Sequence, residues 1–238
     1  MTPTTIHLPR ARPLTGRTVL LAVCGLTLAQ ARVEAQSNLA GQGTAAAVST
    51  PAAGAQQFAT ATLPSGGGMA NADLDNAGVG NTLGADALTA ITSGMVDTNV
   101  VSAQTSAEAA NVNILNGLIT AEQVVALAAS YANGQTAASN ANGSTLLGLV
   151  VNGVNMGDVT PDPNTRIDLP GTGYVVLNEQ APAGDGVTSS GLTVNMIHVV
   201  LQSVVGGVVD PLTGQLVGGT LTTTGEILVG SATSRVAR

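Results

Sequence analysis

Few residues beyond position 35 could carry out catalysis. His198 is the only histidine there, and the single cysteine of the chain, Cys24, precedes that point. A nucleophile that a histidine activates must lie within hydrogen-bond distance of the ring. The candidates for a Ser-His-Asp site are therefore Ser189 or Ser190 with Asp168. A lone histidine in an alternating strand is more typical of a half-buried structural residue, so we predict no catalytic site.

Other groupings of polar residues give weak signals for metal or sugar chemistry. Glu179 and Asp185 flank a short loop, and a glycosidase needs two carboxylates about 5 to 9.5 Å apart. The chain has two tyrosines and no tryptophan, so it lacks the usual aromatic platforms for sugars. The run Asn71–Asn76 begins like a calcium loop but has no glycine at its sixth position, which favours a solvated segment. We predict no metal and no cofactor.

Two local motifs have both a functional and a structural interpretation. Arg166 and Asp168 lie two residues apart, so in a strand they share one face, and a local ion pair is favoured over a ligand site. The segment Leu169–Gly173 (LPGTG) matches the sortase pattern, but sixty-five residues follow it. We predict a turn in which Pro170 fixes φ and a glycine supplies a left-handed conformation.

The composition excludes several classes of partner. Charged residues make up 9% of the chain, and residues from position 36 onward include three arginines and thirteen acids, a formal charge of −10. Such a surface repels phosphate backbones and anionic lipids, so nucleic acids and membranes are not expected partners. With almost no aromatic residues, the core must consist of Val, Leu, Ile and Ala, which favours a sheet.

Residues 1–35 have the pattern of a signal peptide. Three arginines precede the apolar run Thr18–Ala29, which is too short to span a membrane, and small residues allow cleavage after Ala31 or Ala35. Lipidation of Cys24 is disfavoured because the apolar run continues past it. We therefore expect a secreted, extracellular or periplasmic protein without disulfides.

Two further regions follow the expected signal peptide. Residues 36–83 consist largely of Ala, Gly, Ser, Thr, Gln and Asn without helical or strand periodicity, which predicts a flexible, disordered linker. Residues 84–238 contain apolar runs broken by Asn, Gly and Pro at strand-like intervals. They predict an all-β domain, either an antiparallel β-sandwich or a barrel-like fold, and leave the strand order open.

Several strands can be placed within that domain. Alternation over Leu192–Leu201 puts His198 on one face and Asn195 on the other, and because neither face is strongly polar the strand should be central. Asn152-Gly153 predicts a type I′ hairpin turn after Leu146–Val151. The segment 120–131 fits either a helix or a strand. Further strands are expected at 100–109, 174–177, 216–222 and 227–230.

Four segments, 112–128, 163–180, 191–201 and 226–234, resemble the choice-of-anchor P family of bacterial exported proteins. The resemblance spans about residues 84–234 and is most specific in PNTRIDLPGTGYVVLNEQ, which begins at Pro163. It implies a secreted or surface-displayed domain without a known activity, and it favours a strand over 120–131. Family members carry differing C-terminal anchors. Since only eight residues follow Gly230, we expect free secretion rather than C-terminal display.

The expected function is that of a secreted or surface-associated structural or interaction domain, not an enzyme. Its partner is an unidentified extracellular molecule or a second copy of the chain. One alternative is an extracellular hydrolase that uses His198 with nearby acids. Another is a self-assembling extracellular matrix component, because uncharged, Val-rich strands pair readily at unprotected edges.

Overall fold

The computed structural model describes residues 38–209, 212 and 216–238. The chain divides into two units, residues 1–34 and 35–238, and all described residues belong to the second. The predicted signal peptide and its cleavage sites lie outside the described residues.

The described part of the chain consists of β-strands joined by turns, with no helix. The strands are β1 (Asn38–Thr50), β2 (Gly54–Thr62), β3 (Gly68–Val79), β4 (Leu83–Val96), β5 (Val101–Ile114), β6 (Ile119–Ala132), β7 (Ala137–Asn140), β8 (Thr145–Val151), β9 (Val154–Val159), β10 (Thr165–Leu169), β11 (Gly173–Gly184), β12 (Ser189–Val205), β13 (Val208–Val209), β14 (Leu216–Val217) and β15 (Thr220–Ala237).

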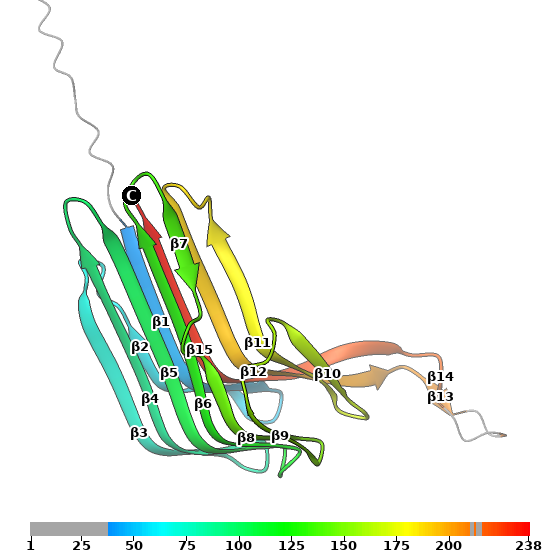
Figure 1. The fold of residues 1–238 in the computed structure, drawn as a ribbon. Coiled ribbons are helices and arrows are strands. Elements are labelled where there is room, and N and C mark those ends of the chain that lie inside the picture. Colours follow the sequence, from blue (N-terminus) through cyan, green and yellow to red (C-terminus); the bar gives the residue numbers. More distant parts are fainter. Residues whose placement is uncertain (1–37, 210–211, 213–215) are drawn as a thin grey trace, which may run out of the picture. The chain divides into compact units, whose positions relative to one another are not determined.

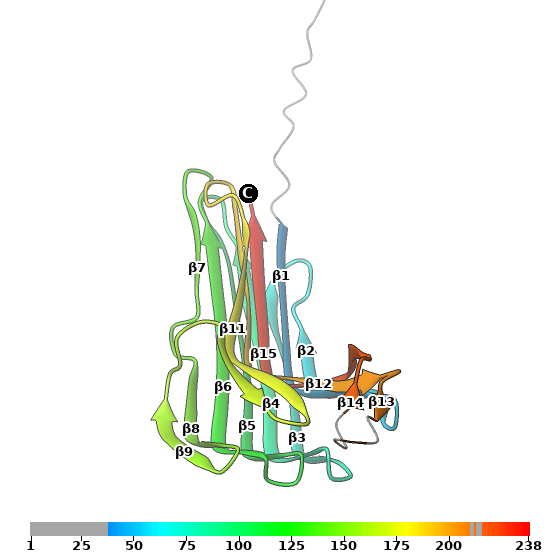
Figure 2. The same cartoon turned by 90° about the vertical axis from the view of Figure 1, so that its right-hand side faces the viewer.

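Two antiparallel sheets pack face to face as a sandwich (Figures 1 and 2). Sheet A has the order β10-β11-β12-β15-β1-β2, and sheet B has the order β3-β4-β5-β6-β8-β9, with β7 also paired to β6. β13 and β14 form a separate two-stranded piece. The predicted all-β class is confirmed, and of the two architectures left open the structure has the sandwich.

The linker prediction is wrong for residues 38–83, which form β1, β2, β3 and the start of β4. The small residues that suggested a linker face the opposite sheet at close range. A Cβ on Gly41 would collide with Thr92 Oγ1, and one on Gly43 would lie 2.9 Å from the Ser106 carbonyl oxygen. Strand periodicity is hidden because glycine and alanine occupy most of the inward positions of β1.

Both sheets bend along a line that crosses most of their strands. In sheet A the line runs through five positions that lie level with one another, each between paired residues on either side: Asn178, Met196, Gly230, Ala45 and Ala59. Alternate members of the row have positive φ, namely Asn178 at 49°, Gly230 at 67° and Ala59 at 49°. Left-handed residues at matching positions turn the strands together, and the same register continues on both sides of the bend.

Sheet B bends at a corresponding set of positions. Ala87, Asn111, Gly148 and Gly157 have φ values of 46°, 49°, 58° and 70°. The Glu122 side chain lies over Gly148, where an added Cβ would be 2.8 Å from Glu122 Cδ. The two sheets therefore follow the same bend, with sheet A on its inner side (Figures 1 and 2).

The bend divides the sandwich into two limbs with different interiors. The terminal limb contains residues 38–44 and 231–237, and the other limb contains residues 46–50 and 226–229. Alanines and hydroxyl residues fill the terminal limb, where Ser130 Oγ lies 2.6 Å from Ser234 Oγ in the opposite sheet. The large buried side chains lie mainly at and beyond the bend, among them Leu83, Leu88, Ile114, Ile119, Leu146, Leu149, Leu169, Leu177, Ile197 and Ile227.

The strand preferred for 120–131 is confirmed, because these residues belong to β6. β6 pairs with β5 on one side and with β7 and β8 on the other, and its Val124, Ala126 and Ala128 are buried. Tertiary pairing thus overrides the helix propensity of alanine and leucine. β12 is central, as expected, between β11 and β15.

The two predicted turns are also confirmed. Asn152 and Gly153, between β8 and β9, have φ values of 50° and 76°, as a type I′ turn requires. The LPGTG segment connects β10 to β11, with Gly171 at 76° and the Thr172 N–H donating to the Leu169 carbonyl oxygen at 2.9 Å. The expected single strand 216–222 is divided into β14 and the start of β15.

The bend makes a prediction about Gly230. A Cβ there would lie 2.8 Å from Val124 Cγ1 in the opposite sheet, in addition to the cost of a left-handed backbone. We expect Gly230→Ala to lower the free energy of unfolding by about 2 to 5 kcal/mol. Urea denaturation measures this change.

Two control substitutions separate backbone strain from collision. Gly153→Ala keeps the left-handed strain but meets open space, so we expect a loss of about 1 to 2 kcal/mol. Gly66→Ala has neither problem and should change stability by less than about 0.5 kcal/mol. A Gly230→Ala loss no larger than that of Gly153→Ala would show that the sheets do not approach closely at the bend.

Candidate functional site

The outer face of sheet A carries a cluster of three polar side chains at the bend. Glu179 Oε2 lies 2.9 Å from His198 Nδ1 and accepts a hydrogen bond of 2.6 Å from Asn195 Nδ2. The His198 and Glu179 side chains are 17% and 31% exposed. The Glu179 carboxylate of β11 thus contacts two side chains of β12, Asn195 and His198.

The bend brings these residues together. Glu179 pairs with Asn195 in the register, and Val176 pairs with His198. Regular alternation would place Asn195 and His198 on opposite faces, as the sequence predicted, but the bend at Met196 switches the faces of β12. That part of the prediction is wrong, since both side chains contact Glu179.

Two polar atoms of the cluster are buried without a hydrogen-bond partner among the described residues: His198 Nε2 and Asn195 Oδ1. When His198 Nδ1 donates its hydrogen to the Glu179 carboxylate, the lone pair remains on Nε2. Nε2 can then accept a hydrogen bond, and no hydroxyl group of the described residues lies within bonding distance to serve as a nucleophile.

The serines and aspartate considered for a Ser-His-Asp site do not meet His198. Ser190 Oγ lies 2.6 Å from Ser139 Oγ on the inner side of the sheet. Ser189 donates to Asp185, and Asp168 pairs with Arg166. The Ser-His-Asp arrangement considered from the sequence is therefore not formed.

Glu179 and Asp185, the carboxylates weighed for sugar hydrolysis, have separate partners. Asp185 accepts hydrogen bonds from the Thr188 hydroxyl group and from the N–H groups of Val187 and Ser189. These bonds hold the pKa of Asp185 well below its usual range. Asp185 therefore stabilises the turn between β11 and β12, whereas Glu179 belongs to the histidine cluster.

The predicted ion pair between Arg166 and Asp168 is confirmed. Asp168 Oδ1 accepts hydrogen bonds from Arg166 Nε at 3.0 Å and from Arg166 Nη2 at 2.9 Å. The Arg166 guanidinium carbon also lies 3.7 Å from the centre of the Tyr174 ring. Both charged side chains are more than half exposed, so the pair contributes less than about 1 kcal/mol.

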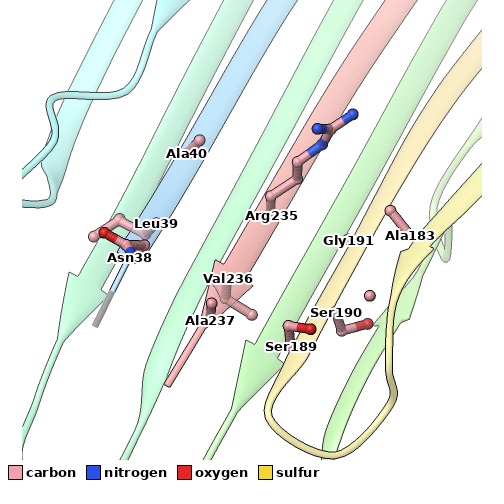
Figure 3. A pocket seen from close by; sticks show the side chains of 11 residues that line it. Asn38, Leu39, Ala40, Ala183, Ser189, Ser190, Gly191, Arg235, Val236 and Ala237 are labelled. Carbon is pink, nitrogen blue, oxygen red and sulfur yellow. The ribbon is translucent and has the colours of Figure 1, made fainter. Parts of the chain in front are cut away.

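A shallow groove crosses sheet A in the terminal limb (Figure 3). One row of the register, Ala183, Gly191, Arg235 and Ala40, lies in it, and its volume is about 310 Å³. Arg235 is the one charged residue of this row, and it belongs to β15. Among the described residues its side chain has no hydrogen-bond or ion-pair partner.

The described residues show neither a metal centre nor a membrane-spanning helix. No group of three or more His, Cys, Asp or Glu side chains in this part of the chain could hold a metal ion. None of its segments forms a helix long and apolar enough to cross a membrane. The run Asn71–Asn76 lies in β3, where most of its side chains are exposed and Asn71 Nδ2 donates to Asp73 Oδ2 at 3.0 Å, so this solvated segment is a strand and not a loop or linker.

Comparison with known proteins identifies no relative. The chain matches no family model, no curated protein and no solved structure. The choice-of-anchor P resemblance accordingly stays a prediction from the sequence.

The Glu179 cluster makes a prediction about stability. Glu179→Ala removes the acceptor of Asn195 and the partner of His198 in a half-buried position, which should cost about 1 to 3 kcal/mol. Asp168→Ala removes an exposed ion pair from the same sheet and should cost less than about 1 kcal/mol. Equal losses in urea denaturation would show that the cluster does not stabilise the bend.

Proposed function

We propose that this chain is an exported structural and interaction domain whose contact element is a β-ribbon at the end of sheet A. The ribbon consists of the last residues of β12 (202–205), β13, β14 and the first residues of β15 (220–224). It extends beyond the other strands of the sandwich in Figure 1.

The ribbon begins where the neighbouring strands of sheet A end. The pairing of β11 with β12 stops at Gly173–Leu201, and that of β1 with β15 stops at Ser49–Glu226. β12 and β15 continue as a pair from Gln202–Thr223 to Val205–Thr220. Two-stranded ribbons are only marginally stable in water by themselves.

Exposed apolar residues on the ribbon are the observation that supports the proposal most directly. Five of its side chains are 46% to 72% exposed: Val204, Val205, Val208, Val217 and Leu221. The sequence from 202 to 225 contains a single charged residue, Asp210. An exposed apolar group of this kind is typical of a surface that contacts another molecule.

Other features support a non-catalytic role outside the cytoplasm. Sequence analysis predicts a signal peptide, a polar surface of low charge and an exported family. His198 has Glu179 as its partner, while Ser189 and Ser190 make hydrogen bonds elsewhere. The proposal therefore assigns the cluster at the bend a structural role.

Substitutions on the ribbon test its role as the contact element. Val205→Lys combined with Leu221→Lys places two charges on the exposed apolar surface, and Met69→Lys places one on an exposed position of β3. Cells that express each variant are separated into washed cells and medium, and the chain is quantified in both. We expect the ribbon variant to reduce the cell-bound fraction about fivefold or more, because charge opposes desolvation of the contact, and Met69→Lys to leave it unchanged.

Two results would contradict this function. Equal cell-bound fractions for all three chains would exclude the ribbon as the contact element. Turnover in a screen of ester, peptide and glycoside substrates, lost in His198→Ala, would establish the hydrolase alternative instead.

A further inference from the structure

We infer that the ribbon pairs with the ribbon of a second copy of this chain, edge to edge along Thr220–Thr224. This inference rests on the proposed function and specifies its partner. Among the described residues this edge is free, because the pairing of β1 with β15 ends at Ser49–Glu226 and leaves five residues of β15 without a neighbouring strand on that side.

The free edges outside the ribbon carry features that oppose pairing with a further strand, and on the β12 edge of the ribbon the Gln202 N–H already donates to the Thr172 carbonyl oxygen at 2.8 Å. Charges, proline, short length and left-handed backbone are the usual protective features of edge strands. The described edges show them as follows: Asp73 and Asp75 on β3, Asp158 and Gly157 on β9, Pro182 on β11, Arg166 and Asp168 on β10, a length of four residues in β7, and the left-handed Ala59 in β2. Thr220–Thr224 has no charge, no proline and no positive φ.

The charge of the chain favours a contact through the ribbon. From residue 36 onward the formal charge is −10, so two copies repel each other where their bodies approach. This repulsion falls off over a Debye length of about 8 Å at physiological ionic strength. An uncharged ribbon that projects from the sandwich allows contact with less repulsion than a contact between the bodies.

A second copy also fits the edge in shape and chemistry. A twofold axis pairs identical edges antiparallel, and twofold dimers are the commonest symmetric assemblies. With the axis at Thr222, Thr220 lies opposite Thr224 and Leu221 opposite Thr223 of the second copy. Every pair is uncharged, and threonines pair favourably across antiparallel strands.

Pairing would also stabilise the ribbon itself. Two ribbons joined along this edge form a four-stranded sheet, and three or more strands with an apolar face are stable where two are marginal. Val204 lies opposite Leu221 in the ribbon, so their side chains share one face. A twofold axis perpendicular to the sheet places the same face of both copies together, which extends the apolar surface.

Single cysteines test the pairing and its register in the chain with Cys24→Ser. Cysteines at the twofold position lie opposite each other, within the Cα separation of about 4.4 to 6.8 Å that a disulfide allows. We expect Thr222→Cys to form a disulfide-linked dimer under mild oxidation about tenfold faster than Met69→Cys, an exposed control on β3. Thr220→Cys and Thr224→Cys should cross-link slowly alone and readily when the two variants are mixed. Non-reducing electrophoresis and mass spectrometry identify the products.

A second measurement does not depend on cysteine. Sedimentation equilibrium of the purified chain should show a dimer, and Thr222→Lys should raise its dissociation constant about tenfold or more by placing like charges opposite each other. Met69→Lys should leave the constant unchanged. Circular dichroism checks that each variant keeps its strand content.

The results separate this inference from the proposed function. Thr222→Cys that cross-links no faster than Met69→Cys, or a wild-type chain that is monomeric at about 1 mM, overturns self-pairing. In that case cell binding that still depends on Val205 and Leu221 leaves the ribbon as the contact element for a different molecule. Fast cross-linking of Ser203→Cys instead would place the contact on the β12 edge and overturn the pairing proposed here.

Discussion

The aligned bend is the constraint on which the other features of this domain depend. A single left-handed residue in a strand would disrupt the pairing on both sides, but Asn178, Gly230 and Ala59 occupy one row of sheet A, and the strands turn together. The row switches the faces of the strands while the register continues. In β15 the alternation of buried side chains accordingly shifts by one residue at Gly230, so that Ala232 and Val229 are both buried. In β12 the same shift places Asn195 and His198 on one face. The polar cluster exists because of the bend.

Close packing of small residues explains how a chain so poor in aromatic residues maintains two sheets. In the terminal limb, Gly41 and Gly43 leave no room for side chains between the sheets. Hydrogen bonds from Ser130 to Ser234 and between Thr92 and Thr105 satisfy the hydroxyl groups buried there. Beyond the bend, leucines and isoleucines supply the larger apolar area. Because the packing differs between the limbs, one hydrophobic pattern does not describe a whole strand.

The difference in packing between the two limbs explains which parts of the structure can be predicted from the sequence. Asn152-Gly153 and the LPGTG turn depend on the backbone preferences of a few adjacent residues, and the central strand β12 depends on a long apolar run. The sequence of β1 resembles a linker because alanine and glycine, which are common in linkers, fill its buried positions where the sheets approach closely. The partnership of Glu179 with His198 depends on the face switch at Met196, which shows no local signal in the sequence. The groove around Arg235 depends on pairing between strands far apart in the chain.

Electrostatic attraction contributes little to how this domain can contact another molecule. The strands of sheet B carry Asp73, Asp75, Asp86, Glu108, Glu122 and Asp158 and no basic residue. Of the arginines in the described part of the chain, Arg166 is held by Asp168, and Arg238 donates to the carbonyl oxygens of Asp97 and Thr98. Arg235 alone is available to an acidic partner. For the proposed function, burial of uncharged surface is therefore the main source of binding free energy, and the ribbon combines five exposed apolar side chains with a position beyond the other strands.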